Sequence, residues 1–216
     1  MGLSCGQRVS RSLNEVEAMA KKAARGAGYP WGLADEAGRA TRWLCLHGFD
    51  GCAGLAALLA RFDGGAVRAW APRLAAGRYE AEGGCLCPLI SGAFVSDRAT
   101  ALAADPMRFG PLVEPLLILP FAAAVSQRRQ SPVTVTWDRV AAVLDGDAVS
   151  FAEDRLPSGH LQIALGGQPG ALRRQTQRAV MREEVWTALD QWASRTYAPA
   201  TDASRARGAG GVLPED

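Results

Sequence analysis

The chain has 216 residues, 48% of them hydrophobic, and its 24 Lys and Arg residues nearly balance 22 Asp and Glu residues, for a formal net charge of +2. This balance, without long runs of one charge, excludes the strongly basic class of nucleic-acid-binding proteins and gives no basis for a membrane-surface partner. The length suffices for one sizeable core without disulfides. We expect one domain over residues 1–197 and a tail over 198–216.

A capped helix is expected first. Ser12 followed by Glu15 is a capping-box pattern, and apolar residues then recur at helical spacing, which predicts a helix over about 13–25. Glycines end it, Pro30 suits the start of a second helix, and Gly48 stops that helix. A third apolar helix follows over 53–61, so a helical part over about 12–62 is predicted.

The middle of the chain predicts a sheet over about 85–166. The apolar runs 85–95 and 115–125 are interpreted as buried strands, although periodicity alone does not separate them from helices. The strict alternation in "PVTVTWD" predicts a half-buried strand, and "HLQIALGG" predicts another. Asp145-Gly146 between two apolar segments predicts a β-hairpin. A meander of three or four antiparallel strands results.

The end of the chain returns to helical spacing over about 183–194, with acidic residues in the first turn. Residues 171–181 show no assignable pattern, and after Tyr197 the composition shifts to that of a mobile tail or a strap. Helices, then strands, then a helix indicate an α+β fold. We expect an N-terminal helical subdomain packed on an antiparallel β-meander, with a C-terminal helix.

The connection between the first two helices is the candidate site. Its glycine N–H groups, an adjacent guanidinium and the next helix N-terminus favour a small anionic metabolite. Asp35 and Glu36 near the start of that helix oppose an anion. The alternative is a tight turn, with glycine for positive φ and aromatic residues filling the corner. The candidate ligand-binding residues are Arg25, Gly26, Gly28, Tyr29, Trp31, Asp35 and Glu36.

Metal binding and nucleophilic catalysis find little support in the sequence. Cys45, His47 and Cys52, or the pair Cys85 and Cys87, offer soft ligands at spacings unlike those of zinc sites. No metal is therefore predicted, and the expected case is buried thiols with a core or capping histidine. No Gly-x-Ser-x-Gly motif is present, so no catalytic residue and no cofactor is assigned.

Two segments, "SLNEVEAMAKKAARGAGYPWGLADEAGRATRWL" at 12–44 and "RTYAPATDASRARGAG" at 195–210, resemble an uncharacterised bacterial family known as a domain of unknown function. The tetrapeptide Arg-Gly-Ala-Gly occurs in both, at 25–28 and 207–210. The resemblance implies no reaction, cofactor or catalytic residue.

Two hypotheses of function stay open. In the first, the chain is a small-molecule-binding protein or an enzyme of unidentified reaction, with its site at 25–31 and the tail as a lid. In the second, it is a non-catalytic accessory subunit that docks on another protein through Tyr29, Trp31 and the tail. Neither involves nucleic acid or a membrane. Because the first residues lack the apolar run of a secretory signal, we expect a cytoplasmic location.

Overall fold

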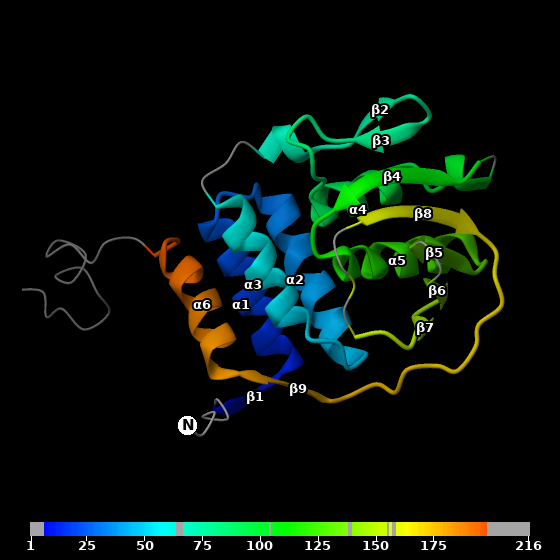
Figure 1. Cartoon of the computed structure of the whole chain (residues 1–216). Helices are drawn as coiled ribbons and strands as arrows, with labels where there is room; N and C mark the ends of the chain where they lie inside the picture. The colour runs from blue at the N-terminus through cyan, green and yellow to red at the C-terminus, as the bar shows by residue number, and fades with distance from the viewer. Residues whose placement is uncertain are drawn as a thin grey trace, which may run out of the picture.

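A computed structural model describes residues 7–63, 67–103, 105–137, 140–154, 156 and 159–197. A bundle of helices forms one half of the molecule, and a mostly antiparallel sheet forms the other (Figure 1). The predicted α+β class is confirmed, and the N-terminal helices precede the strands of the large sheet as expected. The proposed tail at 198–216 and the second Arg-Gly-Ala-Gly copy lie outside the described residues.

The helical half follows the sequence prediction closely. It consists of α1 (Leu13–Gly26), α2 (Trp31–Leu46), α3 (Gly51–Phe62) and α6 (Glu183–Ser194). The capping box is present, because the Ser12 hydroxyl accepts from the Glu15 amide while the Glu15 carboxylate accepts from the Ser12 amide. α1 packs against α2 and α6, and α3 packs against α2 and α6. These contacts bury the alanine-rich faces of α1 and α2.

The sheet is broader than the predicted meander. In the described residues its strand order is β2-β3-β4-β8-β5-β6-β7, with β3 and β4 parallel and the other neighbours antiparallel. β8 therefore lies between β4 and β5, beside strands that precede it by many residues. The strands are β2 (Arg73–Ala75), β3 (Arg78–Glu80), β4 (Met107–Leu112), β5 (Val133–Trp137), β6 (Val140–Asp145), β7 (Ala148–Ser150) and β8 (Gly159–Leu165).

The two apolar runs predicted as strands are helical, and this prediction was wrong. α4 (Pro88–Asp97) and α5 (Leu119–Arg129) occupy them, preceded in the second case by the 3-10 turn Pro115–Ile118. Each helix has a proline in its first turn, where a missing N–H leaves no bond unmade. They are apolar on most sides because α5 packs on β5 and β6, while both helices contact α2. Further 3-10 turns span Val67–Trp70 and Ala101–Ala103.

The predicted hairpin is confirmed, with a shifted loop. Asp145 pairs with Ala148, so the loop residues are Gly146 and Asp147. Gly146 has φ 59°, which places the glycine at the first loop position as in a type II′ turn.

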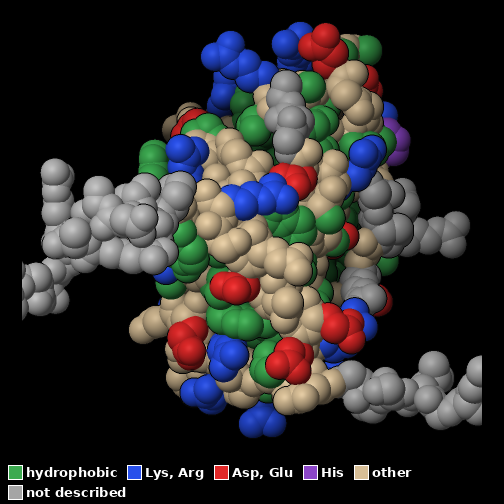
Figure 2. Space-filling model, turned by 90° about the vertical axis from the view of Figure 1, so that its left-hand side faces the viewer, with side chains coloured by type: hydrophobic (Ala, Val, Ile, Leu, Met, Phe, Trp, Pro, Cys, Tyr) green, Lys and Arg blue, Asp and Glu red, His purple; other side chains and the backbone are tan. Residues whose placement is uncertain are grey.

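A separate ribbon went unpredicted. β1 (Arg8–Ser12) pairs antiparallel with β9 (Arg178–Arg182), and β9 lies in the segment without an assignable pattern. β9 leads directly into α6, and the long connection from β8 to β9 runs past the end of α2 (Figure 1). On the side of the molecule where α6 lies, charged side chains of both signs stand scattered among apolar ones (Figure 2). Among the described residues, no helix combines the length and apolar character needed to cross a membrane.

Candidate functional site

The predicted corner, residues 25–31, is stabilised by the chain itself. The amides of residues 27–29 donate to carbonyls in the last turns of α1, at 2.9, 3.0 and 3.1 Å. The Arg25 guanidinium donates to the Tyr29 carbonyl at 2.9 Å and lies over the Trp31 ring, 4.9 Å from its centroid. The N–H groups proposed for an anion are therefore already hydrogen-bonded within the chain.

The aromatic residues of the corner have different surroundings. Tyr29 is 1% exposed, and its hydroxyl lies 3.3 Å from the Cys87 sulfur at the start of α4. Burial is the main cause that raises the pKa of Tyr29 far above its ordinary value. Trp31, by contrast, is 63% exposed. The structure thus brings Arg25, Tyr29 and Trp31 together, with Tyr29 directed into the core and Trp31 toward solvent.

The glycines and carboxylates of the prediction have structural partners. A Cβ at Gly26 would lie 1.8 Å from the Trp192 carbonyl oxygen, so glycine permits the close approach of α6. Gly28 has φ +100°, a conformation that favours glycine. Asp35 forms an ion pair with Lys21, and Glu36 pairs with Arg39 at 2.6 Å. Ligand binding at this corner stays a prediction.

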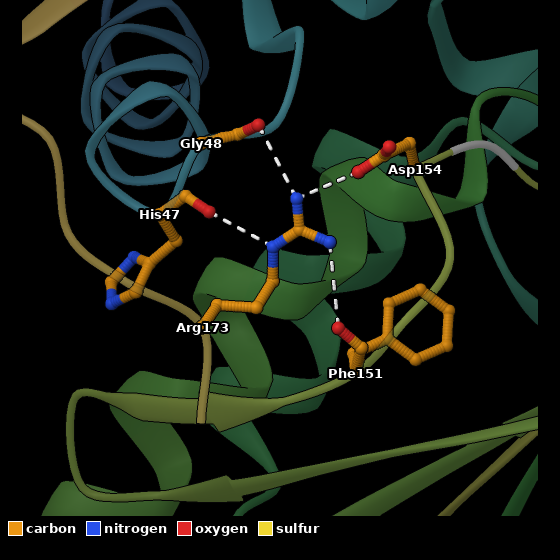
Figure 3. A network of polar contacts seen from close by, with 5 residues as sticks. All are labelled: His47, Gly48, Phe151, Asp154 and Arg173. Atoms are coloured by element: carbon orange, nitrogen blue, oxygen red, sulfur yellow. Dashed lines mark hydrogen bonds and ion pairs between the residues drawn. The ribbon is translucent and has the colours of Figure 1, made fainter. Parts of the chain in front are cut away.

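The connection between α2 and α3, residues 47–50, is built differently. Arg173, from the β8–β9 connection, enters this turn and donates to the carbonyls of His47 at 3.0 Å and Gly48 at 3.3 Å (Figure 3). It also donates to the Phe151 carbonyl at 3.4 Å and pairs with Asp154 at 2.6 Å. One side chain thus ties the turn to the segment that follows β7.

The neighbouring residues complete the C-terminal end of α2. The Thr176 amide donates to the Leu46 carbonyl at 2.7 Å, and its hydroxyl donates to the Cys45 carbonyl at 3.0 Å. A helix leaves its last carbonyls without partners inside the helix, and Thr176 and Arg173 satisfy them here. The guanidinium of Arg173 also lies over the Phe49 ring, 4.0 Å from its centroid. The turn is therefore held in one arrangement by distant parts of the chain.

His47 is buried as expected and caps α2. It is 1% exposed, its Nδ1 lies 2.9 Å from the Trp43 carbonyl oxygen, and its ring stacks on the Trp43 ring. The sulfurs of Cys45 and Cys52 lie 3.9 Å apart, both buried. In the part of the chain that the structure describes, no group of three or more His, Cys, Asp or Glu residues is arranged to hold a metal.

Two adjoining cavities open at the α2–α3 turn, and we call them together the turn cleft. Their volumes are about 280 and 430 Å³, and both are lined by Phe49, Asp50 and Asp154. The first also contains Glu114 and Arg182, with an apolar wall from residues of α2, α3 and the 3-10 turn that precedes α5. The second is lined by residues of the turn, by Arg8 and Arg178 of the β1–β9 ribbon, by Thr176 of the β8–β9 connection and by Cys45 of α2.

The turn cleft is lined by charged groups of both signs. Asp50 accepts from the Ala53 amide at 3.1 Å and caps α3, and Asp154 is oriented by Arg173. On the ribbon, Arg8 lies opposite Arg182, while Arg178 donates to the Ser10 hydroxyl at 2.8 Å. Asp50 and Asp154 line both cavities, while the guanidinium of Arg182 lines the first and those of two other ribbon arginines line the second. The cleft therefore offers carboxylates and guanidiniums together, an arrangement that suits a molecule with both charges.

Sequence reasoning assigned no residue of the turn cleft to a ligand site; Cys45 was considered only as a metal ligand and was not predicted to bind one. For Asp50 a signal existed, because an Asp before an apolar helical run is a typical N-cap. For Arg173 and Asp154 there was no such signal, because both lie in segments without periodicity. Both are also separated from the turn by more than a hundred residues along the chain. Glu114, with φ 45° and ψ 59°, adopts a left-handed conformation, which the surrounding sequence does not predict.

Comparison with known proteins gives a match to one family model over part of the chain, and no activity. No curated protein matches this chain. The resemblance found in the sequence at 12–44 is confirmed, while residues 195–210 lie outside the matched range. The match covers about a third of the chain, including both helix connections but neither Asp154 nor Arg173. Residues 11–84 match the model of a family described as "Protein of unknown function (DUF3726)".

Proposed function

We propose that the protein binds a small zwitterionic molecule, of the size and chemistry of an amino acid, in the turn cleft. The observation that carries the proposal is the pair of adjoining cavities that share Phe49, Asp50 and Asp154. An amino acid would place its ammonium group near Asp50 and Asp154. Its carboxylate would then face Arg8 and Arg178.

The construction of the cleft supports this ligand class. Arginine suits carboxylate recognition because its planar fork of donors matches two oxygens. The apolar wall of the first cavity, which includes Phe49 and Leu117, suits an aliphatic or aromatic side chain. A rigid site binds more tightly because fewer groups must be ordered on binding, and the Arg173 hydrogen bonds supply that rigidity.

The turn cleft is favoured over the 25–31 corner for a simple reason. At the corner, the amides of residues 27–29 and the Arg25 guanidinium already have acceptors within the chain. A ligand there would have to replace those bonds, whereas the turn cleft offers space and charge together. No reaction is assigned, and the proposal is one of binding.

The test is a thermal-shift screen with the proteinogenic amino acids and short amines. A ligand present at a hundredfold excess over its dissociation constant adds about 2.7 kcal/mol of stability, which is a rise of about 5–10 °C in melting temperature for a chain of this size. The substitution Asp154→Asn should abolish the ligand-induced rise. Glu36→Gln, which removes a surface carboxylate at the corner, is the matched control and should preserve it.

Two results would overturn the proposal. One is a screen in which no amino acid or amine raises the melting temperature. The other is a rise that Glu36→Gln abolishes and Asp154→Asn leaves unchanged, which would locate binding at the corner.

One observation favours the accessory-subunit hypothesis as a second candidate. Trp31 is 63% exposed and lies under the Arg25 guanidinium, and tryptophan with arginine is a common centre of protein interfaces. Tyr29 is buried and does not contribute to such a surface. If this candidate holds, a stoichiometric partner copurifies with the full chain and is lost with Trp31→Ala, while Leu74→Ala, at another exposed apolar residue, retains it.

A further inference from the structure

We propose that Cys45 and Cys52 form a redox pair, in which a peroxide oxidises Cys45 and Cys52 then converts the product to a disulfide. Their sulfurs lie 3.9 Å apart across the α2–α3 turn, and Cys45 lines the second cavity of the turn cleft. This inference goes beyond the proposed binding function and does not depend on it. It rests on the sulfur pair, its surroundings and its access.

The surroundings lower the pKa of the Cys45 thiol. Cys45 lies near the end of α2, and its sulfur faces the N-terminus of α3, where the amides of Gly51 and Cys52 donate toward it. The hydrogen bond from the Cys52 thiol is the largest cause that lowers the pKa of Cys45, and the two amides add to it, while burial and Asp50 act in the opposite direction. A thiolate at a helix N-terminus is a typical reactive cysteine.

Cys52 has the properties of the second thiol of such a pair. Its hydrogen bond to Cys45 and its burial raise its pKa, so it keeps its proton until Cys45 has reacted. It is 1% exposed, whereas Cys45 is 4% exposed and reaches the second cavity. A peroxide entering from solvent therefore meets Cys45 first.

The chemistry balances in two steps. The Cys45 thiolate attacks a peroxide oxygen, the O–O bond breaks, and the leaving alkoxide or hydroxide takes a proton, which leaves a sulfenic acid. The Cys52 sulfur then attacks the Cys45 sulfur, the S–O bond breaks, and the hydroxide leaves as water with the Cys52 proton. The two thiols lose two electrons, and the peroxide gains them.

Cys87 provides an internal comparison. It is fully buried, and its sulfur lies 3.3 Å from the Tyr29 hydroxyl oxygen. It lines neither cavity of the turn cleft. Burial raises the pKa of the Cys87 thiol. It should react far more slowly with the same peroxide, because its raised pKa disfavours the reactive thiolate and neither cavity of the turn cleft gives the peroxide access to it.

The experiment treats the folded full chain with hydrogen peroxide, quenches it, and maps disulfides and free thiols by peptide mass spectrometry. We expect a Cys45–Cys52 disulfide that forms at least about tenfold faster than any oxidation of Cys87. Thioredoxin or dithiothreitol should reverse it. Cys52→Ser should accumulate a sulfenic acid at Cys45 that dimedone traps, Cys45→Ser should leave Cys52 reduced, and Cys87→Ser should form the disulfide at the wild-type rate.

The opposite pattern would overturn the inference. If Cys45 and Cys52 both stay reduced in the wild-type chain while Cys87 is oxidised, the pair has no special reactivity. The same conclusion follows if the disulfide forms no faster in the folded chain than in chain unfolded by urea. Both results come from the wild-type chain, so the test does not depend on the folding of either serine variant.

Discussion

The two connections between the first three helices differ in what holds them. The α1–α2 corner is closed by bonds to residues a few positions away, such as that from Arg25 to the Tyr29 carbonyl. The α2–α3 turn is held by Arg173 and Thr176, which lie far along the chain. The corner carries the conspicuous glycines, yet the cavities lie at the turn.

The difference teaches how a local pattern and a binding site are related. Glycines at 26 and 28 meet local demands, namely the close approach of α6 and a positive φ. A cleft needs groups from several segments to converge, and at the turn these are α2, α3, the ribbon and the connection that follows β7. A glycine-rich segment therefore predicts a turn more safely than a site.

The largest effect should come from filling the space at Gly26. Gly26→Ala places a methyl group 1.8 Å from the Trp192 carbonyl oxygen, so α6 must move away from α1. We expect the free energy of unfolding to fall by about 2–3 kcal/mol in urea denaturation. Gly32→Ala is the matched control, because nothing lies within 4 Å of its Cβ, and should raise stability by about 0.5 kcal/mol. Equal effects would contradict the packing role of Gly26.

Removing the guanidinium at the turn should have the next largest effect. Arg173→Met leaves the carbonyls of His47 and Gly48 without this donor, and we expect a loss of about 2 kcal/mol in the free energy of unfolding. Amide hydrogen exchange should also become faster at residues 47–50. Arg174→Met, at an exposed neighbour, should change stability by less than about 0.5 kcal/mol. If Arg173→Met leaves the free energy of unfolding unchanged, the turn is held by other contacts.

A smaller effect is expected from the arginine at the corner. Arg25→Ala removes one hydrogen bond to the Tyr29 carbonyl and the contact with Trp31, at a cost of about 1 kcal/mol. It should leave any amino-acid-induced rise in melting temperature intact. Loss of that rise, with stability unchanged, would restore the corner as the binding site.

The smallest effect should come from the exposed ion pair between α1 and α2. Asp35→Asn removes the partner of Lys21, and both side chains are more than a third exposed. Since water and salt screen such pairs, the free energy of unfolding should change by less than about 0.5 kcal/mol, as measured by urea denaturation. A larger loss would show that the predicted site carboxylates have a structural role beyond this pair.

Much of the fold follows from the sequence where a local signal and the tertiary structure agree. The sequence predicted the Ser12 cap and the amphipathic α6. It also predicted β5 from the alternation of Val133, Val135 and Trp137. α4 and α5 were misread because a helix buried on most sides loses its periodicity and resembles a buried strand. The ribbon was missed because each strand has only five residues, β1 is largely polar, and β9 carries the exposed Val180 between its two buried residues.

The candidate site could not be predicted from local sequence patterns, for a different reason. In the sequence, Asp50 indicates only the start of a helix, which is a structural role. No residue near Arg173 in the sequence indicates that its guanidinium reaches the C-terminal end of α2. Likewise Cys45 and Cys52 are separated by the turn, so their approach depends on how α3 packs against α2. Contacts of this kind depend on the folded arrangement of distant segments.

The position of a bound small molecule tests the central claim most directly. Crystals of the full chain soaked with a set of amino acids and small amines would show that position as electron density. Our account predicts density in the turn cleft, with an ammonium group near Asp50 and Asp154 and a carboxylate toward Arg178. Density confined to residues 25–31, with the turn cleft occupied by water alone, would contradict it.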